Sequence, residues 1–579
     1  MEPALSIGER PLARRSRADV LGRSGEGVFI LGCVALAFLI RLFLLPRDGV
    51  INGDGVYYTM SGRRIIAGDL GGISAYWSPL YPALLGVVSS VVDDLEYAGR
   101  LVSVVAGALL VIPAYLLIRD VYGRWPARLG TLLVVLHPAL LAASGWVMTE
   151  SLYTLILTSG ILVGWHALRG SRGWSFVLTG LLLAAAYLTK PEAIGYLALF
   201  LALTLAAAVA RRQLHARALV ARPALLLAGF AVLGLPYLAL LHDRTGSWTI
   251  SQKLLSNATT AGQGKGLLEL TDDGTTTMMD ELWGDVFRTT KEQPGHAPAV
   301  VAPVAVAPVA VAPAASAPVA TPAPQQAYAN PATRGRAALL ARQLRKQVRE
   351  HVPALLPYPL LLLVVVGFVG APWTRGRWAA DAYLLSFFLC SLLGYALTVI
   401  ELRYAFAMLP LLLAWTSRGV DVIGRWAAAA VARLRRGRPP VDPMWPRLVI
   451  ALGTVLALTP RFPVFLAPDR LQQVPFEEKR AGLWLAARSD SSTLVMAASA
   501  RVAFYAGARH LFVPDADLAT VLQYAARRRV DYLVFGERRQ RSTAKAFPIE
   551  QGPLPRQLRE VYRDEPAPGY RVVVYQLVP

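Results

Sequence analysis

Long apolar runs separated by short polar turns dominate the chain, and this pattern predicts a membrane protein built from α-helices. A helix needs about 20 mainly apolar residues to cross the hydrocarbon core of a bilayer. Eleven runs approach or reach this length, and we expect each to be a membrane-spanning helix. They lie at residues 28–46, 98–119, 127–143, 148–168, 174–190, 193–210, 223–241, 355–371, 380–399, 404–420 and 446–466. The sequence therefore predicts an α-helical polytopic fold with about 11 to 13 spans.

The arginines between these runs predict the orientation of the chain. Cytoplasmic loops of membrane proteins carry an excess of Lys and Arg. If the N-terminal segment 1–27 is cytoplasmic, the inner segments hold most of the loop arginines and the short outer gaps hold almost none. The inner arginines are Arg14, Arg15, Arg17, Arg119, Arg124, Arg128, Arg169, Arg172, Arg211, Arg212, Arg217, Arg222, Arg375, Arg377, Arg433, Arg435, Arg436 and Arg438. An odd number of spans then places the C-terminal region outside, so we expect a multi-pass protein of the inner or plasma membrane.

The segment 47–97 lies outside in this scheme, between the first two spans. Its run 79–92 (PLYPALLGVVSSVV) is apolar but only 14 residues long, which is short for a span. A full span there would reverse the alternation and remove the agreement with the arginines. We therefore expect an interfacial or re-entrant helix in an extracytoplasmic loop, attached to a transmembrane catalytic module at 28–241.

A second outer piece is the long loop 242–353. Its centre, 297–324, repeats Ala, Pro and Val. Proline interrupts both helices and strands, so this stretch is typical of a semi-extended linker without a packed core. The remaining spans follow in the C-terminal transmembrane segment 354–470.

The tail 471–579 has the pattern of a small extracytoplasmic α/β domain. Strand-like runs occur at 493–498, 510–513, 531–536 and 570–578, and helical periodicity occurs at 515–529. This alternation of strands and helix predicts a short, mainly parallel sheet.

Composition and charge agree with a membrane protein. The chain of 579 residues is 55% hydrophobic and 17% charged, below the roughly 25% charged residues of soluble domains. Its net charge of +21 comes largely from loop arginines, which indicates contact with anionic lipids rather than nucleic acid. The two cysteines, Cys33 and Cys390, lie in apolar runs, which argues against a disulfide framework or a thiolate metal site. We expect no signal peptide, because a long polar stretch precedes the first span.

Two carboxylates at predicted outer helix ends are candidates for catalysis. Acidic residues beside membrane helices are costly unless they have a function. Asp54 lies between two glycines in Asn52-Gly53-Asp54-Gly55, a sequence that allows close approach of a substrate but is also common in solvated turns. Glu150 begins the run 148–168, where a carboxylate also suits the first turn of a helix. We expect a second acid at Glu150 facing Asp54 across a cavity.

Two cations lie at other outer helix ends. Lys190 (LTKPEA) and Arg403 (ELRYAF) can together clamp a phosphate. Alternatively, Lys190 extends toward the membrane interface, and Arg403 pairs with Glu401 or Glu192.

Four aromatic residues of the first outer loop are candidates for stacking on a sugar. They are Tyr57, Tyr58, Trp77 and Tyr81. The aromatic belt at the membrane surface is the other explanation for these side chains.

Six segments occur in an order that resembles a known superfamily. They are GDGVYY (53–58), YWSPLYPALLG (76–86), YAGRLVSVVAGALLVIPAYLLIRDVYG (97–123), HPALLAASGWVMTESLYTLIL (137–157), AAAYLTKPEA (184–193) and ELRYAFAMLPLLL (401–413). With them the chain resembles the GT-C superfamily of polyprenyl-phosphate-dependent glycosyltransferases. It is most similar to bacterial members of glycosyltransferase family 39, which are related to protein O-mannosyltransferases and to the aminoarabinose transferase of lipid A. The tail RVAFYAGARHLFVP (501–514) is also similar to soluble tails of some bacterial relatives.

The resemblance covers most of 28–241 and 355–420, with two departures. Asp54 stands alone where many members have Asp-Glu, and Glu150 replaces a more usual aspartate. No counterpart is evident for 242–353.

The resemblance implies a membrane glycosyltransferase of the cell envelope with a GT-C-like fold. It would move a hexose or pentose from a polyprenyl-phosphate donor to an extracytoplasmic lipid, glycan or protein acceptor. Asp54 would act as the base in an inverting attack, and Glu150 would orient the acceptor or tune Asp54. Lys190, Arg403 and Tyr404 would bind the donor phosphate. No cofactor is implied beyond the lipid-linked sugar, and no metal-ligand cluster is evident.

Two other functional classes remain open at this stage. A transporter or flippase of lipid-linked sugars also needs outer cations and a cavity, although it often shows inverted repeats, and we find none. A non-catalytic membrane sensor could bind partners through the tail, but it would leave Asp54, Lys190 and Arg403 unexplained.

Overall fold

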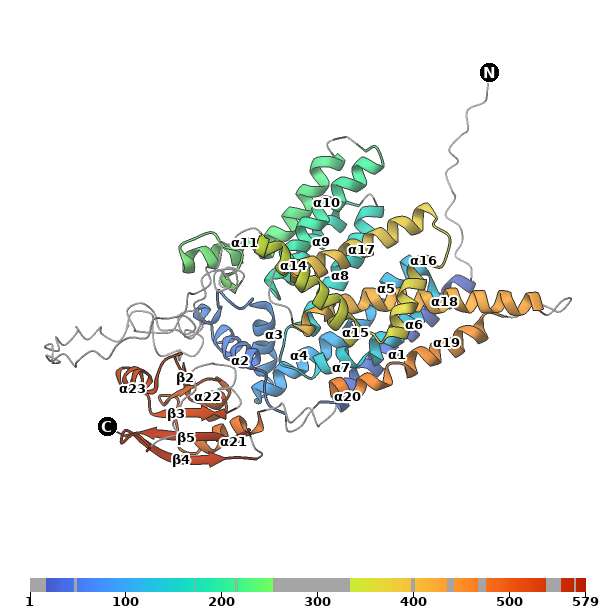
Figure 1. The fold of residues 1–579 in the computed structure, drawn as a ribbon. Coiled ribbons are helices and arrows are strands. Elements are labelled where there is room, and N and C mark those ends of the chain that lie inside the picture. The colour runs from blue at the N-terminus through green and yellow to red at the C-terminus, as the bar shows by residue number, and fades with distance from the viewer. Residues whose placement is uncertain are drawn as a thin grey trace, which may run out of the picture.

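The computed structural model is a helical bundle with a small sheet at its C-terminal end (Figure 1). It describes residues 17–45, 49–170, 172–213, 215, 217–253, 334–396, 401–434, 442–466, 475–537, 553–566 and 569–578. The expected linker 297–324 and most of the loop 242–353 lie outside the described residues.

The bundle contains helices that correspond to every expected apolar run. In chain order its helices are α1 (Arg17–Phe43), α2 (Gly53–Ile66), α3 (Leu80–Ser89), α4 (Leu95–Leu109), α5 (Val111–Tyr122), α6 (Arg124–Leu136), α7 (Pro138–Ser144), α8 (Glu150–Arg169), α9 (Gly173–Tyr187), α10 (Ile194–Ala210), α11 (Arg222–Thr245), α14 (Arg334–Lys346), α15 (Val352–Leu355), α16 (Tyr358–Val369), α17 (Arg375–Ala396), α18 (Leu409–Leu434), α19 (Met444–Leu456) and α20 (Phe462–Leu466). Two short 3₁₀ turns matter for the site, η2 (Pro191–Ala193) and η6 (Leu402–Met408).

The number of helices long enough to cross a membrane is lower than the eleven that the sequence predicts. Within the described residues seven helices qualify by length and composition, or nine if two bent pairs each form one span. The bent pairs are 124–136 with 138–144, at 51°, and 340–355 with 358–369, at 105°. The runs 174–190 and 446–466 give the shorter helices α9, of 15 residues, and α19, of 13 residues. The protein is nevertheless a multi-pass helical membrane protein, as expected.

Residues 49–97 contain two helices, α2 and α3, that pack closely on each other. The run 79–92 forms α3, of only 10 residues, so it is a short helix as predicted. Gly62 of α2 faces Gly86 of α3, and a Cβ at either position would lie 2.4 Å from a backbone oxygen of the other helix. Small residues allow such close contact between helix backbones, and this contact fixes α2, which carries Asp54, on α3.

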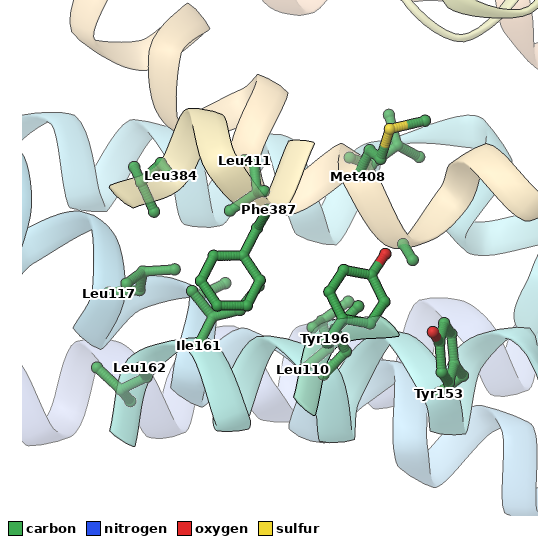
Figure 2. Close-up of a cluster of buried hydrophobic side chains, with 14 of the residues drawn as sticks. Leu110, Leu117, Tyr153, Ile161, Leu162, Tyr196, Leu384, Phe387, Met408 and Leu411 are labelled. Atoms are coloured by element: carbon green, nitrogen blue, oxygen red, sulfur yellow. The ribbon is translucent and has the colours of Figure 1, made fainter. Parts of the chain in front are cut away.

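Buried side chains of α8 and α17 form part of the main core (Figure 2). Ile161 of α8 lies beside Phe387 of α17 in this view. The hydroxyl of Tyr383 donates a hydrogen bond to the carbonyl of Ile161 over 2.7 Å. A buried hydroxyl needs such a partner, so the bond also holds α17 in register with α8.

The tail forms a five-stranded sheet flanked by helices. Its elements are α21 (Phe476–Ala486), β1 (Leu494–Ala497), α22 (Arg501–Ala506), β2 (Arg509–Phe512), α23 (Leu518–Arg527), β3 (Tyr532–Gly536), β4 (Leu558–Asp564) and β5 (Val572–Leu577). The strand order is β2-β1-β3-β5-β4.

The pairing in this sheet corrects the sequence-based expectation. The pairs β1–β2 and β1–β3 are parallel, whereas β3–β5 and β5–β4 are antiparallel. The prediction of a mainly parallel sheet was therefore wrong, and the sheet is mixed. The sequence analysis also missed β4, because this strand (LREVYRD) is largely polar and partly exposed, as is common at a sheet edge.

Candidate active site

Asp54 lies in the first turn of α2, two residues after the extended N-cap residue Asn52. An acidic side chain is favoured there by the partial positive charge at the helix N-terminus. Its side chain is 30% exposed. Asp54 is thus held on a short helix and remains accessible from outside the bundle.

Glu150 is the first residue of α8, and its side chain is only 2% exposed. Its Oε1 lies 3.0 Å from the Nζ of Lys190. Burial of a single charge is costly, and a buried pair avoids part of that cost. Glu150 and Lys190, which are 40 residues apart in sequence, therefore form one buried ion pair.

Lys190 lies in the break between α9 and the 3₁₀ turn η2. Its backbone is extended, because Pro191 begins η2 and disfavours a helical conformation at the preceding residue. The Lys190 ammonium also lies 4.8 Å from the centre of the Tyr404 ring. This cation–π contact fixes the ammonium between Glu150 and Tyr404.

Arg403 connects the two acidic residues. It lies in η6, and its Nη1 is 3.0 Å from Asp54 Oδ2 while its Nε is 3.8 Å from Glu150 Oε1. It also pairs with Glu401, which the sequence offered as an alternative partner. The pair with Glu401 is therefore present, and the same guanidinium reaches three carboxylates through its fork of N–H groups. The role of Arg403 in phosphate binding stays a prediction.

Aromatic rings form one wall of the pocket. Trp77 and Tyr58 line it, with ring centres 5.3 Å apart, and Tyr404 lines it as well. Tyr57 stacks on Trp77 with ring centres 5.9 Å apart, but it does not line the pocket that the described residues form.

Tyr81 lies behind this wall and is fully buried. Its hydroxyl donates to the carbonyl of Gly99 over 2.8 Å, which joins α3 to α4. It does not line the pocket within the described residues either. Tyr81 therefore packs between α3 and α4 and does not reach the pocket, where the sequence offered it as a possible sugar contact.

Two residues near the pocket were not found from the sequence. Lys253 lies on the loop after α11, with its ammonium 5.4 Å from the Trp77 ring and 5.9 Å from the Tyr404 ring. Tyr76 also lines the pocket. A lysine soon after a predicted span, close in sequence to Trp248, was the available signal for Lys253.

Two tyrosines of the pocket keep their protons at neutral pH. Burial, followed by the nearby carboxylates of Asp54 and Glu150, raises the pKa of Tyr58 well above its usual value. Burial raises the pKa of Tyr76 to about 12, although Lys253 opposes this shift. Both hydroxyls can therefore donate hydrogen bonds to a ligand.

The pocket is closed around its own ion pairs. The space left among the lining side chains is about 10 Å³, which is room for about one water molecule. The free space among the lining side chains is therefore smaller than a sugar ring.

The C-terminal domain holds the segment that leads into Asp54. Tyr505 of α22 accepts a hydrogen bond from the Ile51 N–H over 2.8 Å and donates one to Glu96 over 2.9 Å. The Arg501 Nε donates to the Ile51 carbonyl over 2.8 Å, and the Lys479 Nζ donates to the Gly49 carbonyl over 2.7 Å. The backbone just before Asp54 is therefore fixed by the soluble domain, which Figure 1 shows beside α2.

The arrangement offers acid–base groups and anion-binding groups within one pocket. Asp54 is the more exposed carboxylate, Glu150 is buried, and Lys190 with Arg403 supplies two positive charges. Within the described part of the chain, no group of three or more His, Cys, Asp or Glu residues is placed to hold a metal ion.

Comparison with known families finds one match. Residues 77–236 match the family described as dolichyl-phosphate-mannose-protein mannosyltransferase. This segment contains Glu150 and Lys190. No curated protein sequence matches the chain.

Solved structures of ArnT and of an oligosaccharyltransferase have a similar fold. ArnT from Cupriavidus metallidurans bound to undecaprenyl phosphate is 13% identical, with a TM-score of 0.53 over 94% of this chain and 97% of ArnT. The apo state of ArnT gives 0.52 at 13% identity, over 96% and 98%. The Archaeoglobus fulgidus oligosaccharyltransferase tethered with an acceptor peptide gives 0.54 at 12% identity, over 88% of this chain and 69% of that enzyme. The predicted fold and the predicted resemblance to the GT-C superfamily of polyprenyl-phosphate-dependent glycosyltransferases are thereby confirmed.

Proposed function

We propose that the protein is a membrane glycosyltransferase that moves a sugar from a polyprenyl-phosphate donor to an acceptor outside the cytoplasm, with inversion at the anomeric carbon. The observation that carries the proposal is the meeting of Asp54, Glu150, Lys190 and Arg403 in one pocket. These residues come from four separate segments of the chain. Simple snorkelling of Lys190 or solvation of a turn at Asp54 would not bring them together.

Lys190 and Arg403 would bind the phosphate of the donor. The leaving group of the reaction is a polyprenyl phosphate, which is already anionic and needs charge stabilisation more than a proton. The guanidinium fork and the ammonium can both donate to phosphate oxygens. Tyr404 lies against both cations and would add a hydroxyl donor.

Asp54 would remove the proton from the acceptor hydroxyl. It is the more exposed of the two carboxylates, so an acceptor arriving from outside reaches it first. The acceptor oxygen then attacks the anomeric carbon, the bond to the phosphate oxygen breaks, and the electron pair leaves with polyprenyl phosphate. Glu150 would hold Lys190 and Arg403 in place.

Donor binding would have to open the pocket. A phosphate competes with Asp54 for Arg403, since a guanidinium binds carboxylates and phosphates with the same N–H groups. Entry of the donor would therefore release Asp54 from its ion pair at the moment when the base is needed. Trp77 and Tyr58, which line the pocket, would stack on the sugar once space exists.

We further propose that the Asp54 pocket and the C-terminal domain face the outside, and that the N-terminus is cytoplasmic. The arginine distribution along the chain supports this orientation. The acceptor would then be a lipid, glycan or protein of the cell envelope.

Incubation of the purified protein in lipid nanodiscs with radiolabelled polyprenyl-phosphate sugars tests the proposal. Release of polyprenyl phosphate with transfer of label to envelope acceptors is the expected result. In a parallel assay with the protein reconstituted in liposomes, movement of the intact donor across the bilayer without cleavage would instead identify a transporter. Neither cleavage nor movement, over a panel of donor sugars, would leave a sensor as the better description.

The acceptor can be identified separately. Mass spectrometry of envelope glycoconjugates from a strain that lacks the protein should show one class that has lost a single sugar. An unchanged profile of lipids, glycans and proteins would contradict an envelope acceptor.

A further inference from the structure

A second cavity, far from Asp54, carries an excess of positive charge. It has a volume of about 610 Å³ and lies among the last turns of α5 and α8, the turn before α17, the first turns of α17 and the middle of α18. Glu150 and Arg169 are the first and last residues of α8, so the cavity lies about 28 Å along that helix from the Asp54 pocket.

The lining of this cavity contains four arginines and one acidic residue. These are Arg169, Arg377, Arg418, Arg425 and Asp120. Asp120 Oδ1 is paired with the Arg119 Nη2 at 2.9 Å. The four arginines of the lining therefore outnumber its one carboxylate, which is shared with Arg119.

Two of the arginines have structural partners. The Arg377 Nε lies 3.2 Å from Asp381, and its Nη1 donates to the carbonyl of Pro372 over 3.0 Å. Arg425 pairs with Asp421 at 2.5 Å. These contacts explain why Arg377 and Arg425 are present without any ligand.

Arg418 and Arg169 have no such explanation. In the part of the chain that the structure describes, neither forms an ion pair, and the buried Arg418 Nε has no hydrogen-bond partner. The Arg418 guanidinium lies 4.8 Å from the centre of the Tyr122 ring, and that of Arg169 lies 5.0 Å from the Trp165 ring. Stacking on a ring leaves the in-plane N–H groups of a guanidinium directed outward, where they can bind an anion in bidentate fashion.

The position of the cavity indicates where its ligand comes from. Trp426 lines the cavity and is 53% exposed, and Trp373 and Trp378 are exposed close by on the turn before α17 and on its first turn. Exposed tryptophans of membrane proteins concentrate at the level of the lipid head groups. Basic pockets between membrane helices at this level suit anionic lipid head groups.

We propose that this cavity binds the phosphate group of an anionic phospholipid, with Arg418 and Arg169 as its main contacts. The site is independent of the glycosyltransferase assignment, because it shares no residue with the Asp54 pocket. Free phosphate offers the same chemistry, and the experiment below separates the two sources.

Titration of the purified protein with phosphatidylglycerol or phosphatidylcholine, read by native mass spectrometry, tests the proposal. Phosphatidylglycerol should bind more tightly than phosphatidylcholine, whose head group has no net charge. R418Q and R169Q should each weaken this binding about tenfold, since each removes a charge-assisted contact. R418K keeps the charge but not the fork, and it should fall between R418Q and the unchanged protein.

Arg433 provides the matched control. It is exposed in the last turn of α18, so R433Q makes the same charge change at the same end of the bundle, outside the cavity. It should leave the affinity for phosphatidylglycerol within about twofold. Thermal unfolding midpoints of all variants establish that they are folded.

Two outcomes would overturn the proposal. One is an R169Q/R418Q variant that is folded and binds phosphatidylglycerol as tightly as the unchanged protein. The other is displacement of phosphatidylglycerol by an equal concentration of inorganic phosphate, which would assign the cavity to a soluble anion.

Discussion

The charged side chains of the Asp54 pocket are of both signs and pair with one another, whereas those that line the arginine-lined cavity are mainly positive. In the Asp54 pocket, Arg403 bridges two carboxylates and Lys190 pairs with one of them, and only about 10 Å³ of space remains. In the arginine-lined cavity, four arginines face one acid that is already paired, and about 610 Å³ is open.

This difference predicts how each region would bind an anion. In the Asp54 pocket a phosphate must displace an existing ion pair, so binding is coupled to a rearrangement that exposes Asp54. In the arginine-lined cavity an anion would bind to the arginines of the lining, and no ion pair would have to break first. A reaction site benefits from the first behaviour and a stable lipid site from the second.

The largest expected effect comes from D54N. A positioned general base contributes roughly 10²- to 10⁴-fold to a reaction rate, so the turnover of D54N should fall by that factor in the transfer assay. Its thermal midpoint should change little, because a partly exposed ion pair contributes only about 0–1 kcal/mol. Near-normal transfer by D54N would remove Asp54 from the role of base.

The buried partner should behave differently from Asp54. E150Q leaves the Lys190 ammonium buried without its main counter-charge, and breaking such a pair costs about 3–5 kcal/mol. A clear drop in the thermal midpoint of E150Q is therefore expected. The double variant E150Q/K190M removes both charges and should recover much of the loss. An E150Q protein as stable as D54N would show that the two carboxylates are not distinguished by burial.

A smaller effect is expected from Y505F in the soluble domain. The change removes one hydrogen bond to the Ile51 N–H and one to Glu96, each typically worth about 0.5–1.5 kcal/mol. If these bonds position Asp54, kcat should fall about three- to tenfold while KM for the donor changes little. Y562F, on strand β4 of the same domain, should leave kcat unchanged, and an equal loss in both variants would indicate a general effect on the domain.

The smallest effect concerns the independence of the two pockets. Sites about 28 Å apart that share no residue usually behave additively. D54N should therefore bind phosphatidylglycerol within about twofold of the unchanged protein in native mass spectrometry. A tenfold change in the affinity for phosphatidylglycerol would show that the two regions are coupled and would contradict their independence.

The sequence alone predicted the membrane fold and most of the named residues that line the Asp54 pocket. The apolar runs predicted the helices, because span length is a local property. Asp54, Glu150, Lys190, Arg403 and Tyr404 were found through their places at helix ends and in motifs, and all five line one pocket. Tyr58 and Trp77 line it too, whereas Tyr57 and Tyr81 do not, because the direction of a side chain on a short helix depends on what the helix packs against.

Tertiary structure decided the features that depend on residues distant in sequence. Arg403 reaches Asp54 and Glu150 only because η6 packs beside the starts of α2 and α8. From the sequence alone, Arg169 and Arg377 were interpreted as ordinary loop charges. Only the packing of α8, α17 and α18 gathers them around a cavity.

The same division appears in the soluble domain and its contact with the bundle. Four strands followed from local apolar patterns, but the antiparallel pairing of β3 with β5 and the polar edge strand β4 did not. The hydrogen bond from the Ile51 N–H to the Tyr505 hydroxyl joins residues that are 454 positions apart in sequence. Local composition determines which segments are helices, strands or spans, whereas the distances between charges are set by how those segments pack.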